Sequence, residues 1–342
     1  MKTPVAFLIF NRPETTERVF AEIARARPAK LLVVADGPRA SRPEEAELCR
    51  AARSVVERID WDCELLTNFA ETNLGCKNRV SSGITWVFNQ VEEAIVLEDD
   101  CLPHPSFFPF CEELLERYRT DERVMSVSGD NFQFGRARSP HSYYFSCYPH
   151  IWGWASWRRA WRHYDVGMSA WPALRDTDWP LAVVGDKAAA RYWREAFENV
   201  YAGRVDTWDY QWVFACWSRQ GLAALPETNL VTNIGWGGEA THTGASVSPL
   251  GNIPAAEMGF PLRHPPHVSR HAEADRYTFE RVFEWFGHEP TAYGRLHRKV
   301  TGLLPPGLRG PLSALKSGLT RLLPQGAAAR PKATGRGEGG DA

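Results

Sequence analysis

The chain has 342 residues, of which 44% are hydrophobic and 24% are charged, and its formal net charge is −1 at pH 7. These ordinary globular values exclude a collagen-like, wholly disordered or coiled-coil protein. No apolar run approaches the ~18 residues of a membrane span, and the short apolar stretch near the start is not followed by the cleavage site of a secretory signal. Seven cysteines without a C-x-x-C pair argue against a disulfide framework, so we expect a cytoplasmic protein.

Charge is distributed unevenly along the chain. Residues 291–342 contain nine Lys or Arg and two acidic residues, a net charge of +7, and the rest of the chain carries −8. An acidic body lacks the basic face that nucleic-acid binding requires. We therefore do not expect nucleic acid as a partner of the main body.

Tryptophan is also distributed unevenly, because eleven of the fourteen lie between residues 152 and 236. The composition changes near residue 145, without a linker rich in Pro, Gly or Ser. We expect an α/β half at 1–145, an aromatic-rich half packed on it at 146–290, and a basic tail at 291–342.

Short apolar runs alternate with helical patterns through the first 131 residues. The apolar runs predict strands at 5–10, 31–36, 63–68, 93–100 and 124–131. The segments between them predict helices at 15–26, with Thr15 or Thr16 as the N-cap, and at 43–59, 77–91 and 104–119. This alternation predicts a mostly parallel sheet covered by helices on both faces. Ligands of such sheets bind beyond the carboxyl ends of the strands.

Polar residues stand at three of these strand ends: Asn11-Arg12, Asp36-Gly37 and Glu98-Asp99-Asp100. The acidic triplet is the sharpest signal, because three consecutive carboxylates repel one another and give the fold no stability. A hard divalent cation such as Mg²⁺ or Mn²⁺ would resolve the repulsion, since it takes carboxylate oxygens together with substrate phosphates. The alternative is an exposed acidic loop without a ligand.

Motifs typical of several other enzyme classes are absent. The sequence has no G-x-G-x-x-G, P-loop, H-E-x-x-H or G-x-S-x-G motif. Dinucleotide oxidoreductases, P-loop kinases, zincins and serine hydrolases are therefore disfavoured. A phosphate-bearing ligand held by a metal ion and carboxylates remains.

Three segments of the first half, VAFLIFNRPETTERVFAEI, VVADGPR and IVLEDDCLPHPSFFPFCEELLERYRTDERVMSVSGDN, carry a family resemblance. The chain resembles GT-A-fold glycosyltransferases of the family 2 kind, and more closely the N-acetylglucosaminyltransferase I type, whose metal-binding triplet is also Glu-Asp-Asp. The resemblance implies a Rossmann-like nucleotide-sugar-binding half in which Asp36 touches the donor base. It also implies that Asp100 binds the metal, while Glu98 and Asp99 face the sugar and ribose of the donor.

The second half resembles the same family in three segments, YPHIWGWASWRRAW, TWDYQW and LPETNLVTNIGWGGEATHTG. The first implies that Trp152 and Trp154 frame the donor sugar and the acceptor. The second implies that Asp209 is the catalytic base and that the adjacent Trp208 contacts the sugar or the acceptor. The third implies that His242 lies near the diphosphate or the metal. The resemblance covers residues 4–245.

Each of these side chains has a plainer interpretation. Asp209 could act as a general base, made stronger by partial desolvation between aromatic rings, or could simply cap the helix predicted over 210–217. His242 could be an ordinary loop histidine. The spacing of Trp154, Trp157 and Trp161 suits a buried helix face, although one or two tryptophans could stack on sugar rings.

The donor phosphates need a basic partner near the strand ends. Arg12, with Asn11, stands at the end of the first strand and is the better candidate. Lys77 fits a solvated helix start better.

These features predict a metal-dependent inverting glycosyltransferase that moves a sugar from a nucleoside-diphosphate donor to a glycan or lipid-linked acceptor, in surface polysaccharide synthesis. A sugar nucleotidyltransferase is the alternative among enzymes, although its usual Gly-rich phosphate loop is missing after the first strand. A non-catalytic carbohydrate-binding protein would leave the acidic triplet unexplained.

The tail forms a separate prediction. Residues 291–323 contain no acid, and Leu312, Leu315, Leu319 and Leu322 recur at helical spacing among basic residues. Such a helix can lie on an anionic membrane surface, so peripheral contact at the inner face of the membrane is one expectation. The alternatives are a segment that caps the body or a disordered appendage.

Overall fold

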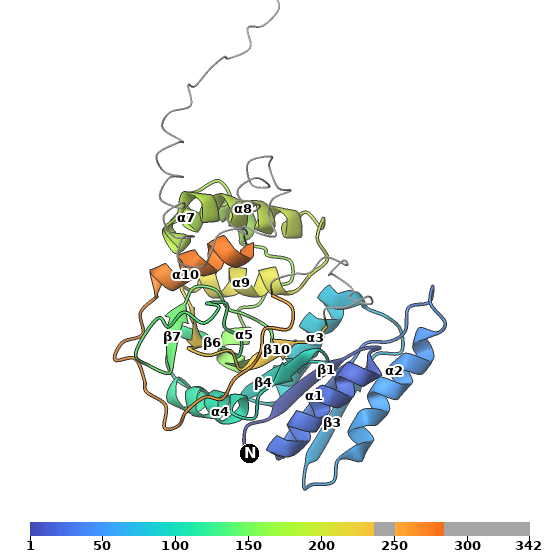
Figure 1. Ribbon diagram of the computed structural model, residues 1–342. Helices are drawn as coiled ribbons and strands as arrows, with labels where there is room; N and C mark the ends of the chain where they lie inside the picture. The colour runs from blue at the N-terminus through green and yellow to red at the C-terminus, as the bar shows by residue number, and fades with distance from the viewer. Residues whose placement is uncertain (236–249, 284–342) are drawn as a thin grey trace, which may run out of the picture. The chain divides into compact units, whose positions relative to one another are not determined.

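A central sheet of eight strands organises the computed structural model, which describes residues 1–235 and 250–283 (Figure 1). The strand order is β3-β2-β1-β4-β8-β6-β9-β7. The strands are β1 (Val5–Ile9), β2 (Lys30–Ala35), β3 (Glu64–Phe69), β4 (Glu93–Glu98), β6 (Val124–Ser128), β7 (Tyr143–Ser146), β8 (Trp154–Trp157) and β9 (Leu222–Pro226). Only β8 and β7 run antiparallel to their neighbours, so the predicted mostly parallel α/β sheet is confirmed.

The helices and the remaining strands surround this sheet. The helices are α1 (Pro13–Ala26), α2 (Glu45–Ser54), α3 (Gly75–Gln90), α4 (Phe107–Arg117), α5 (Arg158–Trp161), α6 (Trp171–Leu174), α7 (Trp179–Val184), α8 (Lys187–Tyr201), α9 (Asp209–Ser218) and α10 (Ala272–Thr278). A 3₁₀ turn (Val55–Arg58) extends α2 and a π-helical turn (Phe279–Phe283) extends α10. β5 (Cys101–Pro103) and β10 (Val231–Asn233) form a separate antiparallel pair.

The predicted start of the first helix is wrong by two residues. α1 begins at Pro13, which favours the first helical position because its missing N–H would have no partner there. Thr15 and Thr16 lie inside the first turn, and both hydroxyls donate to the carbonyl of Arg12. Neither threonine is the N-cap.

Apolar residues of the central strands alternate between the two faces of the sheet. Val5 and Phe7 share one buried cluster with α1 and α4, whereas Ala6 and Leu8 share another with α3, α8 and α9. Both faces of β1 are therefore covered, which explains its continuous apolar sequence. Figure 1 shows α1 and α2 side by side along β1 and β3.

The helix expected around the tryptophans is replaced by a strand and a short helix. Trp154 and Trp157 lie in β8, and their odd spacing points them to opposite faces of the sheet. Trp154 packs with Trp208 and Trp212, while the indole of Trp157 donates to a carbonyl of α4. The predicted buried helix face is wrong because a strand turns this spacing into two buried faces.

The halves that the composition suggested share one sheet. The division at residue 145 falls inside β7, and β8 pairs with β4 while β9 pairs with β6. The described residues, 1–235 and 250–283, accordingly belong to one compact unit. The tail at 291–342 lies outside the described residues.

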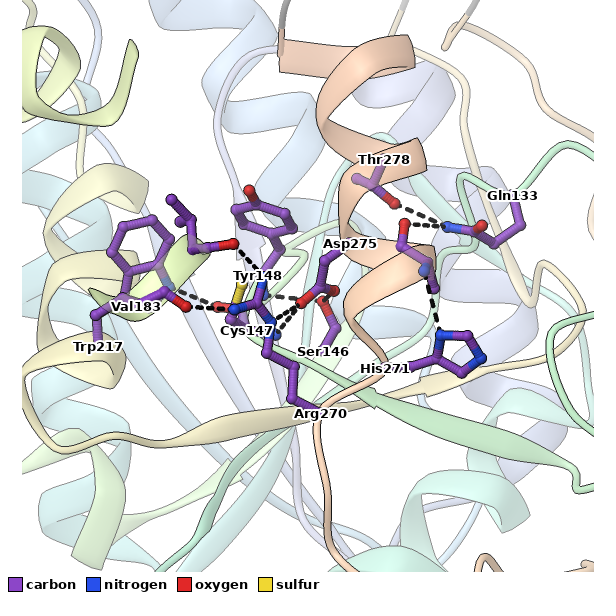
Figure 2. A network of polar contacts seen from close by, with 12 residues as sticks. Gln133, Ser146, Cys147, Tyr148, Val183, Trp217, Arg270, His271, Asp275 and Thr278 are labelled. Atoms are coloured by element: carbon purple, nitrogen blue, oxygen red, sulfur yellow. Dashed lines mark hydrogen bonds and ion pairs between the residues drawn. The ribbon is translucent and has the colours of Figure 1, made fainter. Parts of the chain in front are cut away.

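A buried polar network holds residues 270–278 against the sheet (Figure 2). The carboxylate of Asp275 accepts hydrogen bonds from the hydroxyl of Ser146, the N–H of Cys147 at 3.2 Å, and Arg270. Arg270 also donates to the carbonyl of Val184 at 2.9 Å, at the end of α7. Asp275 thus joins α10, β7 and α7.

Two negative findings concern the described residues. None of the helices in 1–235 and 250–283 has the length and apolarity needed to cross a bilayer. All seven cysteines fall within these ranges, and none forms a disulfide.

Candidate functional site

A cavity of about 670 Å³ opens at the carboxyl ends of β1, β2 and β4. This is where ligands bind in α/β sheets, and the volume falls in the usual range for small-molecule sites. Its walls come from chain segments far apart in the sequence: the ends of the three strands, the start of α3, residues 151–152, residues 205–210, and residues 233 and 235.

Acidic side chains dominate the charged part of this cavity. Carboxyl groups outnumber guanidinium groups by six to three among the lining side chains: Asp36, Glu98, Asp99, Asp100, Asp206 and Asp209 against Arg12, Arg39 and Arg79. A nucleoside diphosphate would be repelled from such a cavity unless a cation entered with it.

The acidic triplet lies at the centre of this charge. The N–H of Phe10 donates to the carboxylate of Asp99 at 3.1 Å, and Nη1 of Arg12 lies 2.8 Å from Oδ2 of Asp100 and 3.7 Å from Oδ1 of Asp99. Burial, together with the neighbouring charge of Asp100, raises the pKa of Glu98 and raises the pKa of Asp99 to about 7. Ionisation of Glu98 and Asp99 is therefore disfavoured even with Arg12 in contact, and an additional cation in the cavity would favour it.

The backbone of residues 233–235 passes close to Asp100 and restricts its position. The pairing of β5 with β10 brings residues 233–235 alongside the triplet, where the N–H of Ile234 donates to the carbonyl of Asp100 at 2.8 Å. A Cβ on Gly235 would lie 2.1 Å from Oδ2 of Asp100. Any larger residue at position 235 would therefore displace the carboxylate of Asp100 from this position.

The donor atoms of the triplet suit a divalent cation that is shared with a phosphate. Within 1–235 and 250–283, no three His, Cys, Asp or Glu side chains are arranged to hold a metal ion by themselves. Mg²⁺ is usually held by one or two carboxylates together with substrate phosphates and water, rather than by an all-protein cage. Asp100 fits that role. The predicted second ligand, His242, lies outside the described residues.

Asp36 has a full set of internal partners. Its Oδ1 accepts from the N–H groups of Gly37 at 2.8 Å and Leu74 at 2.9 Å, and its Oδ2 accepts from Asn73 Nδ2 at 2.9 Å and the Gly75 N–H at 3.1 Å. Burial nevertheless raises the pKa of Asp36. Its carboxylate ties the end of β2 to the start of α3, while its contact with a donor base stays a prediction.

Asp209 lines the same cavity as the triplet. It is the first residue of α9, and Trp208 occupies the N-cap position, so the interpretation of Asp209 as the cap is wrong. Its Oδ1 accepts from the N–H of Tyr210 at 2.9 Å and from the hydroxyl of Thr207. These contacts fix the orientation of the carboxylate, and its role as a base stays a prediction.

The three tryptophans predicted to contact sugar differ in their access to the cavity. Trp152 is partly exposed and lines it, and Trp208 lines it with only 2% of its surface exposed. Trp154 is fully buried and stacks on Trp208 at a centroid distance of 6.0 Å. The prediction of a sugar contact is wrong for Trp154, because its ring supports Trp208 from behind.

Of the residues expected to bind the donor, Arg12 lines the cavity, whereas Asn11 is not among the lining residues. Lys77, which was expected at a solvated helix start, does not line the cavity either. Sequence reasoning missed several residues that line the cavity: Arg39, Asn73, Cys76, Arg79, Asn233 and Gly235. Arg79 offered a signal, because a helix pattern that buries an arginine needs polar partners, and its guanidinium donates to the carbonyls of Ala35 and Asn68. Asn233 and Gly235 offered none, because strand pairing brings them there.

Comparisons with known proteins show only distant likenesses. No protein-family model and none of the curated proteins matches the chain. Among solved structures, a 4-diphosphocytidyl-2C-methyl-D-erythritol synthase from Anaerococcus prevotii is 9% identical with a TM-score of 0.33, over 66% of this chain and 88% of the other. An apo UDP-glucose pyrophosphorylase is 8% identical with a TM-score of 0.32, over 67% and 93%. A provisionally named nucleotide-diphospho-sugar transferase from Desulfovibrio desulfuricans is 12% identical with a TM-score of 0.24, over 46% and 65%. Scores of this size establish neither a family nor an activity, so the function has to come from the chemistry of the cavity.

Proposed function

We propose that the protein is a metal-dependent inverting glycosyltransferase of the GT-A kind. It would move a sugar from a nucleoside-diphosphate donor to a glycan or lipid-linked acceptor in surface polysaccharide synthesis. One observation carries this proposal: the acidic triplet and Asp209, which are more than one hundred residues apart in the sequence, line the same cavity.

The triplet supports the donor side of the reaction. A divalent cation bound at Asp100 would offset the negative charge of the leaving diphosphate. Arg12, which contacts Asp100, would take part in holding the same phosphates. The excess of negative charge in the cavity explains why the diphosphate needs this help to enter.

Asp209 supports the acceptor side. An inverting transfer needs one carboxylate that takes the proton of the acceptor hydroxyl as the anomeric carbon is attacked. The hydrogen bonds from Thr207 and Tyr210 hold the carboxylate at the start of α9. Trp152, partly exposed in the same cavity, offers an aromatic face for a sugar ring.

The products of the reaction separate this function from the nucleotidyltransferase alternative. Purified protein is incubated with a panel of nucleotide sugars and Mn²⁺, and the released nucleotide is measured with and without glycan acceptors. We expect release of a nucleoside diphosphate that stops in EDTA. Formation of pyrophosphate from a nucleoside triphosphate and a sugar 1-phosphate would instead identify a nucleotidyltransferase. Sugar binding without any turnover or nucleotide binding would identify a carbohydrate-binding protein.

A further inference from the structure

Arg12 occupies a special position among the three arginines of the cavity. Arg39 pairs with Glu45, and Arg79 donates to backbone carbonyls. Arg12 instead contacts the triplet itself, with Nη1 at 2.8 Å from Oδ2 of Asp100. It supplies positive charge to the same carboxylate that is expected to bind the metal.

A guanidinium and a divalent cation compete for such a carboxylate. Both are positive, and the guanidinium already occupies Oδ2 of Asp100, so the repulsion between the two cations disfavours their simultaneous contact with this carboxylate. A diphosphate removes the conflict, because its own charge attracts the guanidinium and its oxygens complete the metal shell. Metal and nucleotide should therefore favour each other's binding.

The backbone of Arg12 is held by hydrogen bonds, whereas its side chain borders the cavity and can change rotamer. Its carbonyl accepts hydrogen bonds from the N–H of Thr16 at 3.0 Å and from the hydroxyl of Thr16 at 2.7 Å. Arg12 itself lines the cavity that would hold the diphosphate. A change of rotamer, without movement of α1, can exchange one anionic partner for the other.

We propose that Arg12 is a built-in counter-cation that holds Asp100 before the donor arrives and turns to the diphosphate as the divalent cation takes its place. This inference rests on the proposed function. Its thermodynamic consequence is a positive coupling between metal and nucleotide, and linkage requires each to strengthen the other by the same factor.

The test measures Mn²⁺ binding directly by electron paramagnetic resonance, without turnover. Wild type and Arg12→Gln are titrated with Mn²⁺ alone and in the presence of UDP, GDP, ADP or dTDP. In the wild type we expect the best nucleoside diphosphate to tighten Mn²⁺ binding by ~5- to 150-fold, the usual range of such coupling. Arg12→Gln should bind Mn²⁺ alone at least ~5-fold more tightly, bind the nucleotide more weakly, and show a smaller coupling factor.

Two further variants control for charge and for folding. Arg39→Gln removes a positive charge from the same cavity at a residue paired with Glu45, which keeps Arg42 at 3.7 Å as a partner. It should leave the affinity for Mn²⁺ alone within about twofold of wild type, on the scale of an indirect electrostatic effect. Arg12→Lys keeps the charge and should retain most of the coupling, which also keeps the test decisive if Arg12→Gln folds poorly.

The outcomes separate the two claims. Unchanged or weaker Mn²⁺ binding in Arg12→Gln, or an equal gain in Arg39→Gln, would overturn the role of Arg12 and leave the proposed function standing. If no nucleoside diphosphate binds to the wild type together with Mn²⁺, the proposed function fails, and the inference fails with it.

Discussion

Replacing Gly235 by alanine probes the geometry on which the metal prediction depends. The added Cβ would lie 2.1 Å from Oδ2, 2.9 Å from Cγ and 3.0 Å from Cβ of Asp100. Ordinary van der Waals contact begins at 3.4 Å, so the nearest oxygen would have to retreat by about 1.3 Å. That retreat would also disturb the contact of Asp100 with Arg12.

The displacement should affect binding more than stability. A misplacement of ~1 Å in a binding group can cost ~100-fold, and we expect a loss of this order in the Mn²⁺-dependent affinity for nucleoside diphosphate. Asp100 is only partly buried and can rotate toward the cavity, so the loss of unfolding free energy should stay within the ~1–3 kcal/mol typical of overpacking.

The assay is isothermal titration calorimetry in Mn²⁺, with thermal unfolding of the same samples. Gly259→Ala is the matched control, because its Cβ would meet no atom within 4 Å and its φ is not positive. The control should bind and unfold like the wild type. Wild-type affinity in Gly235→Ala, with the fold intact, would refute the claim that binding uses Asp100 in the position described.

Three other predictions follow from the described contacts. Asp209→Asn should lower kcat by ~100-fold or more and retain nucleotide binding in Mn²⁺, as expected for loss of a general base. Activity within a few-fold of wild type would mean that the base lies elsewhere. Trp154→Ala should lower the free energy of unfolding, measured in urea, by ~3–5 kcal/mol, because its ring is fully buried. Trp152→Ala should lower it by less and should weaken sugar binding, because this ring is partly exposed in the cavity. Equal losses of unfolding free energy would contradict the different burial of the two rings. Asp130 lies just after β6, with its buried carboxyl group 3.5 Å from Nδ1 of His150. Burial raises the pKa of Asp130, so the folded protein binds its proton more tightly than the unfolded chain and gains stability from this group as the pH falls through the raised value. Asp130→Asn should reduce that gain in urea titrations carried from neutral pH down to the ordinary titration range of aspartate, and an unchanged pH dependence would show that Asp130 does not contribute to it.

The parts of the site predicted from the sequence are those that neighbouring residues determine. The apolar runs that became β1, β2 and β4 are followed directly by Arg12, Asp36 and the acidic triplet, and parallel strands bring these ends to one edge. Strand periodicity and the position of the acids were therefore sufficient to predict where the cavity lies.

The parts that were not predicted depend on contacts between distant segments. Gly235 reaches Asp100 because β10 pairs with β5, and no pattern near residue 235 indicates that pairing. The four donors that surround Asp36 include residues 73–75, which only the folded loop before α3 brings close. Trp154 was misplaced because its spacing from Trp157 and Trp161 fits a helix as well as the observed strand followed by α5.

The most direct test of the central claim is a calorimetric titration of nucleotide sugars into the full chain, in Mn²⁺ and in EDTA, with wild type and Asp100→Ala. If the cavity takes its donor together with a divalent cation, the wild type should bind the nucleotide sugar in Mn²⁺ and lose that binding in EDTA. Asp100→Ala should not bind the nucleotide sugar in Mn²⁺, although its thermal unfolding should stay cooperative. Equal affinity of the wild type in Mn²⁺ and in EDTA, or unchanged affinity of Asp100→Ala in Mn²⁺, would contradict the claim.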